Sequence, residues 1–246
     1  MLKGVDVASP YQNASYDVTG LSFAFVKATQ GTGYVNPLMG AQLQHAEAHG
    51  LVTGVYLFMD PAHNPHDQAV YFHAHAIVKA GTMIAVDWES LHSKWPSNAD
   101  KDALIHELKG LYPHNKVGLY TNLDGWLNHD RTSVCGDFLW IADPGTAGKV
   151  SIKHPWVFHQ WGIRGNVDQD VANFPDLNSL KRWAGMTTPT PPAKPPVTPP
   201  AFNPRTEPGF NNWAYKNPPT EADAWARLKH VETMLVSLCQ HFGVPH

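Results

Sequence analysis

The chain has 246 residues, a formal net charge of −3 and a pI near 6.6, a balance that argues against a nucleic-acid partner held by bulk positive charge. Hydrophobic residues make up 43% and charged residues 16% of the chain, so a packed core is expected and disorder throughout is excluded. No apolar run reaches the roughly 18 residues that a membrane-spanning helix needs, and we expect no membrane insertion.

Residues 1–185 alternate between strand-like and helix-like segments. Strands are predicted at residues 4–7, 23–28, 52–58, 83–86, 116–120, 138–142, 156–160 and 167–171. Helices are predicted between the earlier strands, at residues 38–49, 66–80 and 99–111. Repeated strand–helix–strand units favour a parallel sheet, and this many strands in one short domain favour closure. The predicted fold class is α/β, a TIM-like (β/α) barrel with a reduced set of outer helices.

The composition changes at residue 186. Eleven of the thirty-five residues 186–220 are proline, which predicts a stiff linker rather than a packed element. Residues 221–246 are predicted to form a helix, because a capping box precedes apolar residues that recur at spacings of three and four. This seam predicts homo-oligomerisation through residues 221–242, and a single amphipathic helix packed on the barrel is the alternative. The predicted domains are thus a barrel (1–185), a linker (186–220) and a helix (221–246).

Cysteine usage and the N-terminus bear on where the protein is made. Cys135 and Cys239 lie on opposite sides of the linker, so no disulfide framework is expected and the chain is predicted to be made in a reducing compartment. The N-terminus enters a strand-like run directly, without the charged and apolar regions of a secretory signal. We therefore expect synthesis in the cytoplasm without a signal peptide.

Two carboxylates follow the apolar run at residues 83–86. In a strand, side chains two apart point the same way, which places the Cα atoms of Asp87 and Glu89 roughly 6.6 Å apart at ~3.3 Å per residue. Two such carboxyl groups shift each other's pKa in opposite directions, so that one keeps its proton while the other is charged. A glycosidase needs this division of roles.

Further acids are predicted at the same end of the barrel, where active sites of parallel barrels lie. Asp6 ends the first strand, and Asp168 and Asp170 lie in the last. Because the first and last strands of a closed barrel are neighbours, Asp6 and Asp168 should come close and face the strand-four acids across the barrel mouth.

Several short motifs stand in a specific order along residues 1–184. They are Gly4-Val5-Asp6-Val7-Ala8-Ser9, Phe25-Val26-Lys27-Ala28-Thr29-Gln30-Gly31, Tyr56-Leu57-Phe58, Asp87-Trp88-Glu89, Gly118-Leu119-Tyr120-Thr121, Leu139-Trp140-Ile141-Ala142, Gln160-Trp161, and Val167-Asp168-Gln169-Asp170 with Phe174. In order and spacing together they resemble the family-25 glycoside hydrolases, the Chalaropsis-type lysozymes, many of them phage endolysins. Two positions depart from the family pattern: Leu57 stands where His is common, and Gln30 where Glu is common.

The resemblance implies roles for the four acids. Glu89 is expected to be the general acid, and Asp87 to stabilise an oxocarbenium ion or to orient the substrate's acetamido group as nucleophile. Asp6 and Asp168 are expected to tune the pKa values of this pair and to bind sugar hydroxyls. Asp170 is the alternative to Asp168 and is otherwise expected to be structural.

Aromatic residues near the predicted strand ends are expected to stack on sugar rings. Trp88 is the strongest candidate because it lies between two acids, although most tryptophans of a barrel belong to the core. The substrate-binding residues expected in all are Tyr56, Trp88, Trp140, Gln160, Trp161 and Asp170.

The activity implied by the resemblance is that of an N-acetylmuramidase, which cleaves the β-1,4 bond between N-acetylmuramic acid and N-acetylglucosamine in peptidoglycan. Glycan strands are the expected partner, and neither cofactor nor metal is required. The histidine cluster at residues 63–75 is expected to be a solvated helix face, not a metal site. Such an endolysin would be made in the host cytoplasm and act on the bacterial cell wall. The alternative is a catalytically inactive barrel that binds cell-wall glycan.

Overall fold

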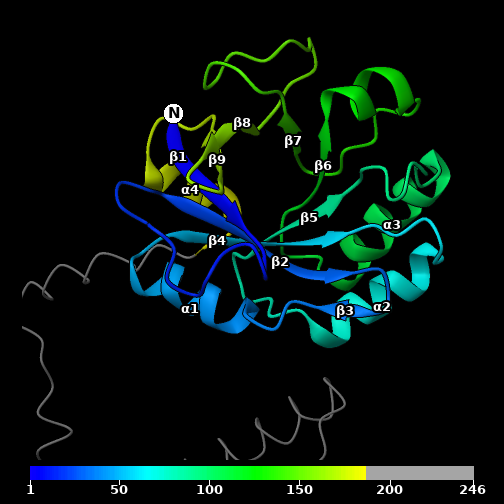
Figure 1. Ribbon diagram of the computed structural model, residues 1–246, viewed down its shortest axis with the longest axis horizontal. Helices are drawn as coiled ribbons and strands as arrows, with labels where there is room; N and C mark the ends of the chain where they lie inside the picture. Colours follow the sequence, from blue (N-terminus) through cyan, green and yellow to red (C-terminus); the bar gives the residue numbers. More distant parts are fainter. Residues whose placement is uncertain (187–246) are drawn as a thin grey trace, which may run out of the picture. The chain divides into compact units, whose positions relative to one another are not determined.

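The computed structural model describes residues 1–186, which form a closed eight-stranded barrel (Figure 1). The barrel strands are β1 (Leu2–Val7), β2 (Phe23–Gln30), β4 (Val52–Phe58), β5 (Met83–Asp87), β6 (Val117–Asn122), β7 (Leu139–Ala142), β8 (Phe158–Arg164) and β9 (Val167–Ala172). Pairing of β1 with β2 closes the barrel, and the short β3 (Tyr34–Val35) adds to the edge of β2. The linker and the C-terminal helix predicted from residue 186 onward lie outside the described residues, apart from Met186.

The sequence predicted a parallel barrel, and this prediction is wrong for the last strand. Strands β1, β2, β4, β5, β6, β7 and β8 run parallel, but β9 is antiparallel to both of its neighbours, β8 and β1. The reason is the two-residue connection between β8 and β9. Gly165 and Asn166 both have positive φ, 56° and 70°, as in a tight hairpin turn, whereas a parallel crossover needs a dozen or more residues.

Three helices cover the outer face of the parallel strands: α1 (Met39–Ala48), α2 (Pro65–His75) and α3 (Asn98–Leu111). Side-chain caps start two of them, because Asn64 accepts from the Asp67 N–H and Ser97 from the Asp100 N–H. Helix α2 ends five residues earlier than predicted, because the chain becomes extended at Ala76. In this extended segment Ala76 and Val78 pack against the buried hydrophobic core.

A fourth helix, α4 (Leu177–Ala184), was not predicted. It is capped by Asp176 and ends at Gly185, whose φ of 83° is the left-handed conformation typical of a helix end. Its half-buried Trp183 packs against Phe138 and Phe158, which belong to the buried core. The connection after the last strand thus contributes to the barrel core. None of the helices in residues 1–186 has the length and apolar character needed to cross a membrane.

Aromatic rings fill the barrel interior. Phe25 stacks on Trp140 with ring centroids 4.4 Å apart and meets Phe158 edge to face at 5.1 Å. Gly54 makes room for this packing, because a Cβ there would lie 2.3 Å from the Phe25 ring. The interior is therefore a packed core rather than a pore.

Candidate active site

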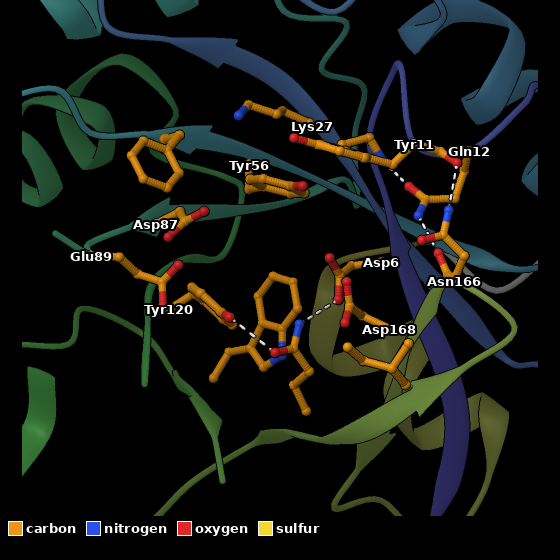
Figure 2. A pocket seen from close by; sticks show the side chains of 15 residues that line it. Asp6, Tyr11, Gln12, Lys27, Tyr56, Asp87, Glu89, Tyr120, Asn166 and Asp168 are labelled. Atoms are coloured by element: carbon orange, nitrogen blue, oxygen red, sulfur yellow. Dashed lines mark hydrogen bonds between the residues drawn. The ribbon is translucent and has the colours of Figure 1, made fainter. Parts of the chain in front are cut away.

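A cleft of about 380 Å³ opens at the carboxyl ends of the parallel strands (Figure 2). Seven residues that the sequence predicted for the site line it: Asp6, Tyr56, Asp87, Glu89, Trp140, Gln160 and Asp168. In Figure 2, Asp87 and Glu89 lie on one side of the cleft, while Asp6 and Asp168 lie together on the other. The cleft thus brings together all four predicted acids.

The acids reach the cleft from three strands and one loop. Asp87 ends β5, and Glu89 follows it on the same side of the chain. Asp6 lies near the end of β1, directly opposite Asp168 in the β1–β9 register. Because β9 runs antiparallel, Asp168 enters the cleft from the beginning of its strand and not from the end.

Burial shifts the pKa values of these carboxyl groups upward, since it disfavours the charged form. Burial and the neighbouring Asp168 raise the pKa of Asp6 to about 7. Burial and the charge of Glu89 raise the pKa of Asp87 well above its ordinary value, against an opposing effect of Lys27. Burial also raises the pKa of Glu89, and a hydrogen bond from Asn122 opposes this shift. Burial thus favours the protonated form of each of these three carboxyl groups.

One oxygen of Asp87 has no hydrogen-bond partner among residues 1–186. This atom, Oδ1, is buried, and the whole residue is only 6% exposed. A buried acceptor without a donor is costly. An N–H or O–H group of a bound molecule would supply the missing donor.

Lys27 brings a positive charge into the cleft, which the sequence analysis did not foresee. Its Nζ donates to Gln30 Oε1 at 2.7 Å and lies 4.9 Å from the centroid of the Phe58 ring. Burial lowers the pKa of Lys27, and the charges of Asp87 and Glu89 raise it. The lysine is the natural counter-charge for ionised Asp87 and Glu89.

A short hydrogen-bond chain fixes Asp6. Gln160 Nε2 donates to Asp6 Oδ2 at 2.7 Å, and the hydroxyl of Tyr120 donates to Gln160 Oε1 at 3.0 Å (Figure 2). Gln160, expected to bind substrate, thus also orients Asp6. Tyr120 lines the cleft as well, although the sequence analysis assigned it no role.

Asp170 lies beneath the cleft and does not line it. It is 1% exposed, and its Oδ1 accepts from Trp140 Nε1 at 2.8 Å. The expected substrate contact of Asp170 is therefore wrong for this structure, and the contact observed is structural: Asp170 holds the indole of Trp140 at the cleft.

Trp88, the aromatic residue most strongly expected to touch sugar, is fully buried. Alternation along the chain turns it away from the cleft, because Asp87 and Glu89 on either side face into it. Its Nε1 donates to the Pro96 carbonyl at 3.0 Å, and its ring packs against Trp95 at 4.9 Å. The sequence-based expectation for Trp88 is wrong.

Trp161 also lies outside the cleft. The β8–β9 register shifts between Gln160 and Gly162, and such a bulge re-aims a side chain. Gln160 keeps its place in the cleft, whereas Trp161 lines a separate cavity of about 590 Å³ together with Arg164 and Asp17. The expected contact between Trp161 and a substrate in the cleft is therefore not supported.

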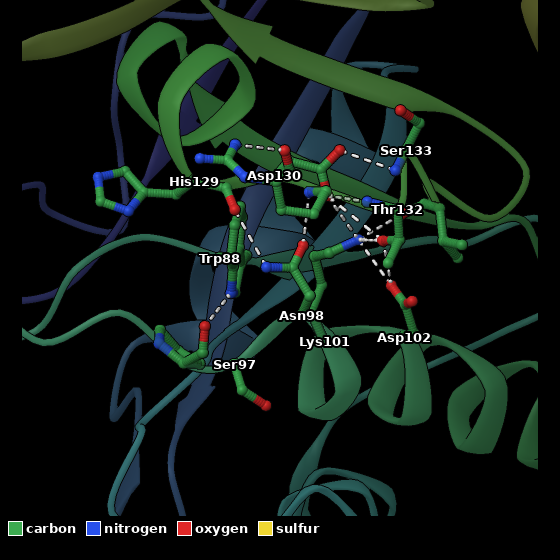
Figure 3. A network of polar contacts seen from close by, with 12 residues as sticks. Trp88, Ser97, Asn98, Lys101, Asp102, His129, Asp130, Thr132 and Ser133 are labelled. Atoms are coloured by element: carbon green, nitrogen blue, oxygen red, sulfur yellow. Dashed lines mark hydrogen bonds and ion pairs between the residues drawn. The ribbon is translucent and has the colours of Figure 1, made fainter.

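A buried polar network lies next to Trp88, the residue between Asp87 and Glu89 (Figure 3). The Nζ of Lys101, a residue with no exposed surface, lies 2.7 Å from Asp102 Oδ1 and 3.2 Å from Asp130 Oδ1. It also donates to Thr132 Oγ1 at 3.1 Å and lies 5.6 Å from the centroid of the Trp88 ring. The network joins α3 to the loop that follows the π-helical turn η1 (Gly125–His129).

Two loops form one rim of the cleft. Gln12 Nε2 donates to the Asn166 carbonyl at 2.5 Å, and Asn166 Nδ2 donates to the Tyr11 carbonyl at 2.9 Å. These bonds tie the loop after β1 to the β8–β9 turn. Tyr11 and Ile163 line the cleft here and are 71% and 73% exposed, so this rim presents apolar surface to an incoming ligand.

Within residues 1–186, no group of three or more His, Cys, Asp or Glu side chains is arranged to hold a metal ion. The four histidines of the predicted solvated face, His63, His66, His73 and His75, are all exposed.

Glycosidases act through a pair of carboxyl groups, and such pairs lie at the mouth of this barrel. Residues 5–170 match the sequence profile described as glycosyl hydrolases family 25. The chain belongs to this family and is a glycoside hydrolase.

Solved structures share the fold. A family 25 glycosyl hydrolase from Bacillus anthracis has 22% identity and a TM-score of 0.66, with 76% of this chain and 94% of the other covered. The lysozyme from Streptomyces coelicolor has 24% identity and a TM-score of 0.61, covering 76% and 98%. The catalytic domain of endolysin ply40, from bacteriophage P40 of Listeria monocytogenes, has 21% identity and a TM-score of 0.56, covering 74% and 97%. No curated protein sequence matches this chain.

Proposed function

We propose that this glycoside hydrolase is a lysozyme of the N-acetylmuramidase type, which cleaves the β-1,4 bond between N-acetylmuramic acid and N-acetylglucosamine in peptidoglycan. The family supports hydrolysis of a glycosidic bond, and the lysozyme and endolysin folds described above support peptidoglycan as the substrate. The observation that carries the mechanism is the buried, unpartnered Oδ1 of Asp87, two residues from Glu89 in one cleft.

Glu89 is the general acid in this proposal. Burial raises the pKa of Glu89 and so favours the protonated form that a general acid needs. The proton passes to the glycosidic oxygen as the bond from that oxygen to the anomeric carbon breaks. Glu89 then regains a proton from the water that completes hydrolysis.

Asp87 stabilises the positive charge that develops on the sugar. An acetamido N–H of the substrate would donate to Asp87 Oδ1, which has no hydrogen-bond partner within residues 1–186, and this hydrogen bond would favour the ionised carboxylate. Ionised Asp87 would then either stabilise an oxocarbenium-like centre directly or orient the acetamido oxygen for attack on the anomeric carbon.

The remaining cleft residues bind the substrate and shift the pKa values of Asp87 and Glu89 in this proposal. Asp6 and Asp168 face the acid pair across the cleft and are placed to accept hydrogen bonds from sugar hydroxyls. Tyr56 and Trp140 line the cleft but expose little of their surface, 7% and 1%, so they shape its floor. No step in this scheme needs a metal or a cofactor, so activity is expected to survive chelation by EDTA.

The proposed place of action is the bacterial cell wall. The catalytic domain of endolysin ply40, a phage protein, shares the fold, which supports an endolysin role in which the enzyme is made in the host cytoplasm and reaches the wall from inside.

The test is mass spectrometry of digested peptidoglycan after borohydride reduction. Fragments ending in reduced muramic acid support a muramidase, whereas reduced glucosamine ends, or no fragments, would contradict the proposal. Glu89→Gln should abolish digestion. Glu107→Gln, a matched change on the outer helix α3, should leave it intact.

A further inference from the structure

Asn122, the last residue of β6, contacts the proposed general acid. We propose that Asn122 is a positioning residue that dictates which oxygen of Glu89 carries the catalytic proton. This inference rests on the proposed role of Glu89.

The orientation of the Asn122 amide follows from its two contacts. Its Nδ2 donates to Glu89 Oε1 at 2.7 Å, and its Oδ1 accepts from the backbone N–H of Gly125 at 2.8 Å. Since a backbone N–H can only donate, the amide oxygen must face Gly125. The NH₂ group must therefore face Glu89.

Gly125 makes this arrangement possible because no larger residue fits there. A Cβ at this position would lie 2.2 Å from Thr121 Oγ1 and 2.8 Å from the Trp95 ring. Gly125 is buried and opens the π-helical turn η1. The close packing of this turn therefore brings its first N–H to the Asn122 side chain.

The consequence concerns the proton of Glu89. An amide NH₂ donates and cannot accept, and the carbonyl oxygen of a carboxylic acid is a better acceptor than its hydroxyl oxygen, so the contact favours Oε1 as the unprotonated oxygen of Glu89. This contact favours the proton on Oε2, for which no hydrogen bond from residues 1–186 is observed. Asn122 thus leaves Oε2 free to protonate the glycosidic oxygen.

The other side chains that shift the pKa of Glu89 are charged, whereas Asn122 is neutral. Asp168 from β9 raises the pKa of Glu89 and Lys27 from β2 lowers it, while Asp87, Asp6 and Tyr120 line the same cleft from β5, β1 and β6. Burial is the largest cause that raises the pKa of Glu89, and the Asn122 hydrogen bond is the largest that lowers it.

Asn122→Asp is the informative variant, because it keeps the size and the acceptor for Gly125 but replaces the donor facing Glu89 with a carboxylate oxygen. Loss of the donor and the added negative charge both raise the pKa of Glu89. The basic limb of the kcat/KM profile should therefore move to higher pH by about one unit, and kcat at the optimum should fall roughly tenfold. KM should change little.

Asn122→Leu removes donor and acceptor together, and should also shift the basic limb upward. Asn128→Asp is the matched control: this exposed residue lies in the same turn, so the variant adds the same charge without touching Glu89. Its profile should match that of the parent enzyme. Thermal unfolding of every variant establishes that it is folded.

A second readout does not depend on turnover. A ¹³C NMR titration of the Glu89 carboxyl, assigned with Glu89→Gln, should show a higher pKa in Asn122→Asp. An unchanged carboxyl pKa and an unchanged pH profile in both Asn122 variants would overturn the inference, as would an equal shift in Asn128→Asp. Absence of peptidoglycan cleavage by the parent enzyme would instead reject the proposed function, while the titration would still test the Asn122–Glu89 contact.

Discussion

Replacing Lys101 with methionine should destabilise the barrel far more than the loss of one surface charge would. The Lys101 side chain is fully buried, and its partner Asp130 is 3% exposed. Lys101→Met fills a similar volume but leaves Asp130 with no positive partner. Removing one member of a buried ion pair costs about 3–5 kcal/mol.

The contacts that remain place the expected loss at the lower end of this range. Asp130 still accepts from the Ser133 N–H at 2.8 Å, and Asp102, the second partner of Lys101, is 27% exposed and can be hydrated. We therefore expect a loss of about 3 kcal/mol in the free energy of unfolding. At 2–4 °C per kcal/mol for a domain of this size, the Tm should fall by roughly 6–12 °C.

The assay is thermal and denaturant unfolding followed by circular dichroism, with Lys109→Met as control. The Lys109–Asp137 pair is 2.6 Å long but lies at the surface, with side chains 43% and 25% exposed, so its loss should cost under about 1 kcal/mol. Adding Asp130→Asn to Lys101→Met should recover part of the stability, because no unpaired charge then remains. A loss in Lys101→Met no larger than in Lys109→Met would refute this reasoning.

Three further predictions concern the cleft, the second cavity and the C-terminal region. Lys27→Met removes the charge that lowers the pKa of Asp87. This pKa should then rise, and the acidic limb of the kcat/KM profile should move to higher pH. An unchanged acidic limb would contradict this prediction. Trp161→Ala should leave the turnover of a short soluble glycan unchanged, because Trp161 lines a separate cavity; a loss of turnover in a variant that thermal unfolding shows to be folded would place Trp161 at the substrate. The heptad seam predicts that the full chain self-associates while a chain ending at Gly185 is monomeric, and light scattering giving equal mass per particle for both would reject this.

Much of the site could be predicted from local pattern alone. Side chains alternate along a strand, and active sites of parallel barrels lie at the carboxyl ends of strands. These two rules bring Asp6, Asp87 and Glu89 into one cleft. The same alternation also excludes Trp88 from the cleft, because a residue between two that face inward must face outward. The hairpin at Gly165-Asn166 likewise had a recognisable turn signal.

Other features depended on contacts between residues far apart in the chain. Lys101 is a lysine on a helix, a pattern that predicts a solvated side chain, yet it is buried because Asp130 and Thr132 from a distant loop surround its ammonium group. Lys27 and Asn122 likewise carry no sequence signal of their own.

The sequence by itself thus determined the strand order and the acids that strand ends present, because both follow from residue type and periodicity. Only the tertiary structure decided how those acids are tuned. A pKa depends on burial and on charges and donors within a few ångströms, and those neighbours come from strands that are distant in sequence.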